Sequence, residues 1–301
     1  MKWIGNVLRG FAMGSADVVP GVSGGTMAFV LGIYEDLVAA TRRLTDVEFL
    51  TRLRRFELRG ALEYVDWRLL VSVGAGIALA VLTLAPFLEW ALENEPALLW
   101  SFFFGLVLAS IWVVGRRVPS WNTSKAGLVV VGAALAWIVV GLVPVSTPDA
   151  AWFVLLSGSL AICAMMLPGI SGAFILVLLG KYETALSAVN ERDLLTLLLL
   201  ASGAGLGLLV FARFLNWLLA RFHDATVAVL LGLMAGSLRK IWPWKETLTT
   251  RLDHHGDLVA VLEHNVAPAL DNATLIAIAV ALAGLVAVFL LARLESRGSS
   301  L

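Results

Sequence analysis

The stretch VVPGVSGGTMAFVLGIYEDLVAA, residues 18–40, decides the fold, because it occurs a second time as MLPGISGAFILVLLGKYETALSA, residues 166–188. Over these 23 positions the two copies share nine identical residues at an offset of 148 (residue 18 to residue 166). The identical pairs include the less common types Pro, Tyr and Glu. Chance does not align these types in two apolar segments, so the chain contains an internal duplication.

Each copy is an apolar run that Pro-Gly-x-Ser-Gly interrupts. Proline lacks a backbone N–H and ends a helix, and the glycines permit a reversal of the chain. In the first copy the two legs, residues 3–19 and 25–38, each reach only about 20 to 25 Å, which is short of a bilayer crossing. We therefore predict a re-entrant helical hairpin in each half, with Ser23 and Ser171 as N-caps of the second legs.

The composition indicates an integral membrane protein, since 59% of the residues are hydrophobic and only 15% are charged. Basic and acidic residues balance at 22 each, which argues against nucleic acid as a partner. The single cysteine, Cys163, is interpreted as a structural core thiol. The N-terminus resembles a signal peptide, but residues 12–19 belong to the repeated hairpin, so we expect no cleavage there.

A second similarity extends the duplication to the following segments. FLEW at 87–90 matches FLNW at 214–217, and GLVLASI at 105–111 matches GLMAGSL at 232–238, both at an offset of 127. The two offsets differ by 21 residues, which places an extra segment in the first half, the Arg-rich stretch 41–68. Its amphipathic spacing predicts a helix that lies on an anionic leaflet, with a solvated charged loop as the alternative.

We thus predict an all-α polytopic membrane protein that forms one membrane domain from two repeats, each a re-entrant hairpin plus three transmembrane helices. Repeat 1, residues 1–145, has its hairpin at 3–40, the basic segment at 41–68 and spans at 69–92, 97–115 and 126–143. Repeat 2, residues 146–301, has its hairpin at 152–188 and spans at 194–220, 225–238 and 273–292.

Three spans are an odd number, so the second repeat should enter the membrane inverted relative to the first. The positive-inside rule places both termini and the Arg-rich segment in the cytoplasm. If each broken run instead crossed the membrane once, the Arg-rich segment would face outside, against that rule.

The hairpin tips are the candidate binding site, because the second leg of each begins with unpaired N–H groups at membrane depth. Such donors and the helix dipole favour an anion, and hydroxyls from Ser23, Thr26 and Ser171 can add to them. The alternative is a tight packing turn in which Ser bonds its own backbone. The residues expected to bind substrate at the tips are Ser23, Gly24, Gly25, Thr26, Ser171, Gly172 and Ala173.

Charged residues near the apolar runs are the next candidates. Asp17, three residues before the first break, is expected to be a proton or cation site or to bond the hairpin backbone. Glu35 and Glu183, twelve residues beyond their serines, would lie near the headgroups as gating or ion-coupling groups, or as interfacial anchors. The cations expected to guide a phosphate are Arg9, Arg213 and Arg239, with snorkelling as the alternative for the first two. We assign no chemistry to the histidines and expect no metal or cofactor.

Three stretches resemble the PopT-type polyprenyl-phosphate translocases: ADVVPGVSGGT with GIYE, PGISGAFILVLLGKYE, and GSLRKIWPW at 236–244. The second motif has Ala173 where that family has a small hydroxyl residue. The resemblance implies flipping of undecaprenyl phosphate from the outer to the inner leaflet of the bacterial plasma membrane.

The leading hypothesis is therefore a lipid-phosphate flippase that holds the headgroup at the tips, leaves the prenyl tail in the bilayer and uses protons as a coupling ion. An ion-coupled transporter of a small organic anion or phosphate shares the same site physics. A membrane lipid phosphatase is less favoured, because it needs a His beside phosphate-binding Arg and no His lies in or next to either PGxSG motif.

Overall fold

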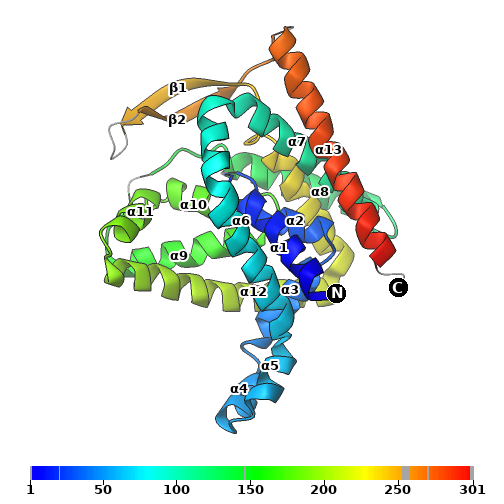
Figure 1. Cartoon of the computed structure of the whole chain (residues 1–301), viewed down its shortest axis with the longest axis vertical. Helices are drawn as coiled ribbons and strands as arrows, with labels where there is room; N and C mark the ends of the chain where they lie inside the picture. Colours follow the sequence, from blue (N-terminus) through cyan, green and yellow to red (C-terminus); the bar gives the residue numbers. More distant parts are fainter. Residues whose placement is uncertain (1, 20, 146, 253–257, 270, 299–301) are drawn as a thin grey trace.

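The computed structural model describes residues 2–19, 21–145, 147–252, 258–269 and 271–298, which fold into thirteen helices and one two-stranded sheet (Figure 1). The helices of the first half are α1 (Lys2–Asp17), α2 (Gly24–Val30), α3 (Tyr34–Arg43), α4 (Val47–Arg54), α5 (Leu58–Val65), α6 (Trp67–Asn94), α7 (Pro96–Gly115) and α8 (Thr123–Val139).

The second half contains α9 (Ala151–Met166), α10 (Gly172–Leu178), α11 (Tyr182–Asn190), α12 (Leu194–Ser237) and α13 (Asn272–Gly298). Between α12 and α13 lie the strands β1 (Lys245–Leu252) and β2 (Leu258–Asn265), which pair antiparallel with Lys245 opposite Asn265. The sequence predicted only a loop in this region, so the two strands are an addition to a chain that is otherwise helical, as expected for an all-α polytopic membrane protein.

Several helices are long and apolar enough to cross a membrane. Among the described residues these are α6, α7, α12 and α13, while α8 and α9 are apolar but shorter. Helix α12 has 44 residues but non-helical φ and ψ at Phe222, so it consists of two helices that meet at a kink. The predicted spans 194–220 and 225–238 correspond to its two parts, which no loop separates. The chain is a multi-pass membrane protein.

The two hairpins have the same backbone. Helices α2 and α10 have seven residues each and start 148 residues apart, and Gly21 and Gly169 both have a φ of +87°. Each second leg then ends earlier than predicted, because Gly32 and Gly180 adopt left-handed φ values of +65° and +62° and begin a new helix direction. The bend between α10 and α11 is 106°.

Close glycine contacts repeat between the halves. A Cβ on Gly10 would lie 2.1 Å from the Val73 carbonyl oxygen, and one on Gly158 would lie 2.3 Å from that of Leu200. The reverse contact is also duplicated, between Gly76 and Val7 in the first half and between Gly203 and Leu155 in the second. The pairs α1 with α6 and α9 with α12 therefore pack in the same way.

The last helix of each half, α8 in the first and α13 in the second, packs against a helix of the other half. Gly105 of α7 contacts Ala281 of α13, and the equivalent Gly232 of α12 contacts Val129 of α8. Contacts of the opposite sense, Gly284 with Phe102 and Gly132 with Val229, complete the two pairs. Each half thus packs its last helix, α8 or α13, against the other half through equivalent contacts.

The glycine contacts give a testable stability difference. Gly76→Ala places a methyl group 2.1 Å from a backbone oxygen of α1, whereas Gly74→Ala, two residues away on α6, meets nothing within 4 Å. We expect Gly76→Ala to lower the free energy of unfolding by about 1–3 kcal/mol through overpacking. Thermal melting in detergent measures the difference from Gly74→Ala, and equal melting temperatures would contradict the contact.

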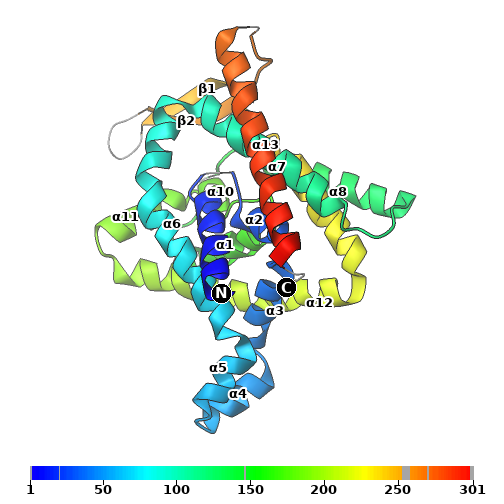
Figure 2. The same cartoon turned by 45° about the vertical axis from the view of Figure 1, so that its right-hand side comes forward.

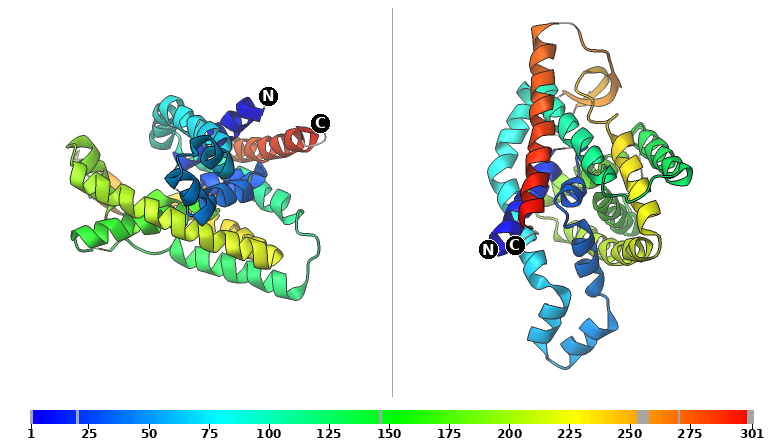
Figure 3. Two further views of the ribbon diagram at one scale, coloured as in Figure 1. Left: turned by 90° about the horizontal axis from the view of Figure 1, so that it is seen from below. Right: turned by 90° about the vertical axis from the view of Figure 1, so that its right-hand side faces the viewer.

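The basic segment forms two short helices rather than one. Helix α3 continues to Arg43, and the helical path after it is interrupted at Phe56 and Asp66, whose φ values are +57° and +56°. Helices α4 and α5 extend from one end of the molecule (Figure 3). The start of α1 and the end of α13 lie toward that end, and the β-hairpin lies toward the opposite one (Figures 1 and 2).

Candidate functional site at the hairpin tips

The first hairpin tip already holds a carboxylate. Asp17, the last residue of α1, accepts a 2.7 Å hydrogen bond from the N–H of Gly24 at the start of α2. Ser23 is the N-cap of α2, as predicted, and its hydroxyl accepts from the Gly25 N–H at 3.2 Å. A Cβ at Gly24 would lie 2.3 Å from the Asp17 carboxylate, so only glycine fits there. Asp17 therefore bonds the hairpin backbone, which was one of its two expected roles.

The two tips are in direct contact. The Thr26 hydroxyl accepts a 3.0 Å hydrogen bond from the N–H of Gly169, and the Tyr34 hydroxyl donates to the Met166 carbonyl at 2.9 Å. The Ser23 hydroxyl lies 3.3 Å from the Leu167 carbonyl oxygen. Thr26 and Ser23 are fully buried. Three side chains of the first hairpin thus hold the backbone of the second tip.

The second tip lacks the equivalent hydrogen bonds from side chains to the start of its helix. Ser171 is the N-cap of α10, but its side chain makes no capping hydrogen bond. Met165 occupies the position that corresponds to Asp17. In the described part of the chain, no side chain accepts a hydrogen bond from the N–H groups of Gly172 or Ala173. The two tips therefore have similar backbone conformations, but Asp17 in the first tip corresponds to the uncharged Met165 in the second.

The end of α12 and the segment after it lie against both tips. Gly169 lies against α12, where a Cβ would meet the Ser237 hydroxyl at 2.8 Å, and Gly21 lies against the side chain of Lys240. The Lys240 ammonium is 5.4 Å from the ring centroid of Phe174 in the first turn of α10. The Lys240 side chain thus contacts both hairpins. Sequence reasoning placed it in a loop, and the signal for it was the GSLRKIWPW stretch.

The three predicted arginines bond elsewhere. Arg9 donates to Asn6 within α1, and Arg213 lies 3.7 Å from Asp46. Arg239 donates to the Trp137 carbonyl and stacks on that ring. These contacts do not reach either tip, so their expected role as phosphate guides receives no support from the geometry.

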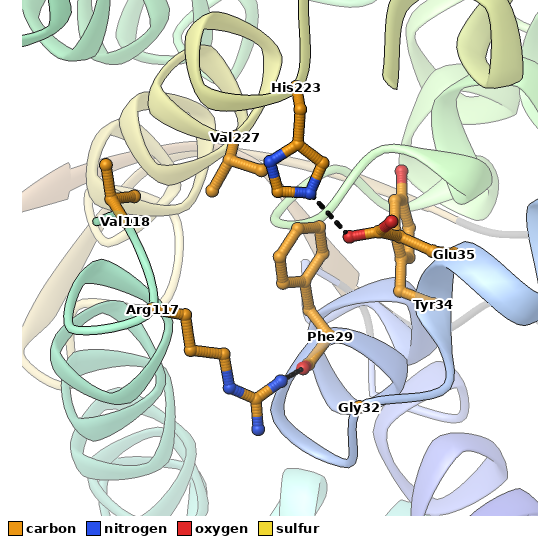
Figure 4. A pocket seen from close by; sticks show the side chains of 8 residues that line it. All are labelled: Phe29, Gly32, Tyr34, Glu35, Arg117, Val118, His223 and Val227. Atoms are coloured by element: carbon orange, nitrogen blue, oxygen red, sulfur yellow. Dashed lines mark hydrogen bonds and ion pairs between the residues drawn. The ribbon is translucent and has the colours of Figure 1, made fainter. Parts of the chain in front are cut away.

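Glu35 lines a cavity of about 90 Å³ beyond the C-terminal end of α2 (Figure 4). Its carboxylate lies 2.9 Å from His223 at the kink of α12, and the Arg117 guanidinium donates at 3.0 Å to the Phe29 carbonyl across the cavity. The predicted helical distance from Ser23 to Glu35 does not apply, because α2 ends at Val30. The histidine, to which no chemistry was assigned, is a partner of this glutamate.

Glu183 occupies the corresponding position in the first turn of α11. Just before it, the buried Lys181 pairs with Asp149 and lies 3.3 Å from the Thr147 carbonyl oxygen. Each bend at Gly32 or Gly180 is therefore followed by a glutamate on the next helix.

The sequence profile of a family described as undecaprenyl phosphate translocase-like matches residues 13–259, which include both hairpin tips and the segment after α12. The chain belongs to this family. A protein of Vibrio cholerae serotype O1 named polyprenyl-phosphate transporter is 42% identical over 268 residues, which cover 89% of this chain and 87% of that protein. One of the same name from Staphylococcus aureus is 31% identical over 261 residues, 80% of this chain and 87% of that protein. No solved structure matches the chain.

Family membership decides between the broad classes of function. The names of the family and of both relatives describe transporters, not enzymes, so the phosphatase alternative is set aside. The GSLRKIWPW stretch and both PGxSG motifs, which suggested the family, lie within the matched residues and meet around the two tips.

Proposed function

We propose that this protein moves a polyprenyl phosphate, with undecaprenyl phosphate as the expected substrate, from the outer to the inner leaflet of the bacterial plasma membrane. The observation that carries the proposal is the contact between the two tips, made by Thr26, Tyr34 and Ser23, with Lys240 against both. The two relatives named polyprenyl-phosphate transporters support the substrate class.

The phosphate would bind where the tips meet, and the prenyl tail would stay in the bilayer. In a low-dielectric site, hydroxyl and N–H donors bind an anion more strongly than in water. Because Asp17 already accepts from Gly24, the donors left for a phosphate belong mainly to the second tip, namely the Ser171 hydroxyl and the N–H groups of Gly172 and Ala173. Lys240 adds a full positive charge.

Proton coupling would act through Asp17. An ionised carboxylate repels a phosphate and accepts the hydrogen bond of the Gly24 N–H. A protonated carboxyl group repels the phosphate less and accepts that hydrogen bond more weakly. Proton uptake from the outer face would therefore favour loading, and proton loss to the cytoplasm would favour release. Glu35 and Glu183, each following a glycine bend, would be the gates.

The repeats would be inverted about a two-fold axis in the membrane plane. Two observations support this arrangement: each half packs its last helix against the other half, and α4, α5, the start of α1 and the end of α13 lie opposite the β-hairpin. By the positive-inside rule, the end with α4 and α5 would be cytoplasmic.

Cysteine labelling tests this topology. We expect a membrane-impermeant maleimide added outside cells to label Asn94→Cys, at the C-terminal end of α6, and not Arg54→Cys in α4, with the background from Cys163 removed by Cys163→Ala. Permeabilised cells should label both. Labelling of Arg54→Cys with protection of Asn94→Cys would contradict the inverted topology.

A leaflet-specific assay tests the function itself. Proteoliposomes that contain undecaprenyl phosphate should lose it from the outer leaflet faster than protein-free liposomes. Equal rates in the two, together with uptake of a small phosphate or organic anion into the lumen, would instead favour the small-anion transporter.

A further inference from the structure

Two lysines near the tips share one carboxylate. Lys240, which follows α12, and Lys245, the first residue of β1, both face Oε2 of Glu263 on β2, at 3.5 Å and 3.4 Å. The Lys245 ammonium also lies 4.2 Å from the ring centroid of Trp100 on α7. The cluster therefore joins the β-hairpin to α7 and, through Lys240, to Phe174 of α10.

The charges of this cluster do not balance. Two ammonium groups face one carboxylate, and both distances exceed the roughly 2.7–2.9 Å of a close charge-assisted hydrogen bond. The Lys245 side chain is only 9% exposed, and those of Lys240 and Glu263 are 28% exposed. Burial, offset in part by Glu263, lowers the pKa of Lys245 to about 8. An additional anion would stabilise both ammonium groups.

The cluster is continuous with the hairpin tips. The stem of Lys240 covers Gly21 of the first tip, and its ammonium faces Phe174 of the second. The rings of Trp100 and Phe174 flank the two ammonium groups. Trp100 is buried, and the partly exposed Phe174 offers apolar surface beside the charge. A ligand suited to this place carries a compact anion on an apolar chain.

We propose that Lys240 and Lys245 form the first binding place for the phosphate monoester of the lipid on the β-hairpin side, and that Glu263 is an internal competitor which the phosphate displaces. The proposal rests on the transport function proposed above. A phosphate monoester carries about −1.5 to −2 charges near pH 7, more than the single charge of Glu263. It would contact both ammonium groups at once, while the partly exposed Phe174 contacts the first isoprene units. Because Lys240 also contacts both tips, the phosphate could then move to them while it stays bound to this ammonium group.

If Glu263 competes with the phosphate, substitutions of the lysines and of the glutamate should change the affinity in opposite directions. For farnesyl phosphate binding to the purified full-length protein, measured by calorimetry at pH 7, we expect Lys240→Gln and Lys245→Gln each to weaken affinity by about tenfold, as for loss of one charge-assisted contact. Glu263→Gln should strengthen affinity about threefold or more, because the internal anion is removed. If these ion pairs were only structural, all three variants would have lower affinity or lower stability than the wild type.

Matched controls separate this cluster from a general charge effect. Asp149→Asn removes the carboxylate partner of the buried Lys181, away from the tips, and should leave affinity unchanged. Lys245→Arg keeps the positive charge. Above pH 8 wild-type affinity should fall as Lys245 loses its proton, and it should stay constant in Lys245→Arg. Farnesol should bind weakly, and inorganic phosphate should compete with farnesyl phosphate.

Failure of this inference differs from failure of the function. If wild-type protein flips the lipid and binds farnesyl phosphate, but the lysine variants bind equally well or Glu263→Gln binds less, the cluster is not the binding place. Farnesol binding as strong as farnesyl phosphate binding would also overturn it. If wild-type protein neither flips the lipid nor binds farnesyl phosphate, the proposed function itself is wrong.

Discussion

In sealed proteoliposomes, the Asp17→Asn variant is expected to flip polyprenyl phosphate at a rate that no longer responds to a pH gradient. The asparagine Oδ1 can still accept the hydrogen bond from Gly24, which is 2.7 Å long in the wild type, so the tip keeps its shape. Loss of the charge should cost about 1 kcal/mol of unfolding free energy. What the variant loses completely is a group whose protonation can differ between the two faces. The measurement compares flipping with and without an imposed gradient.

Asp17→Ala is the matched control for this prediction. It removes the acceptor as well as the charge, so the N–H of Gly24 is left without its partner and unfolding should become easier by about 1–3 kcal/mol. The two variants thus separate the structural bond from the titratable charge. Gradient-driven flipping that persists unchanged in Asp17→Asn would show that the coupling group lies elsewhere.

The hairpins could be predicted from sequence because their signals are local. A proline and glycines interrupt an apolar run, and a serine follows at the N-cap position, where the structure places Ser23. The second bend in each hairpin was missed, although Gly32 and Gly180 are identical in the two copies. A single glycine in an apolar run is also compatible with a continuous helix, so only its left-handed φ reveals the break.

Other differences between the predicted and the observed secondary structure also have local causes. The single basic helix was predicted from spacing alone, and spacing does not reveal that Phe56 and Asp66 adopt positive φ. The strands around Lys245 and Asn265 lie in a segment without the apolar alternation that identifies a half-buried strand.

The candidate site shows where sequence reasoning stops. Asp17, Ser23 and Thr26 were found because they lie within or beside the repeated motif. Their partners were not found, because the contacts of Thr26 and Ser23 span more than 140 residues and no spacing rule encodes them. For the same reason the arginines were favoured over Lys240, whose position beside both tips depends on the turn after α12. His223 likewise gains a partner, Glu35, only through tertiary structure.

Thr26→Val is expected to impair both stability and transport, because Thr26 holds the second tip in place. Its hydroxyl accepts from the N–H of Gly169 at 3.0 Å, and the side chain has no exposed surface. Valine has nearly the same shape but offers no acceptor, so the buried N–H of Gly169 loses its partner at a cost of about 1–3 kcal/mol. Each 1.4 kcal/mol is a factor of about ten in the equilibrium between joined and separated tips, and flipping should fall accordingly.

Thr26→Ser keeps the hydroxyl and should retain most of the wild-type flipping rate, which distinguishes the hydrogen bond from the loss of a methyl group. Tyr34→Phe removes the neighbouring bond to the Met166 carbonyl. Because both bonds join the same two tips, the effects of Thr26→Val and Tyr34→Phe on flipping should be non-additive in a double-mutant cycle. Strictly additive effects, or wild-type flipping in Thr26→Val, would mean that the contact between the tips serves packing alone and that phosphate is bound elsewhere.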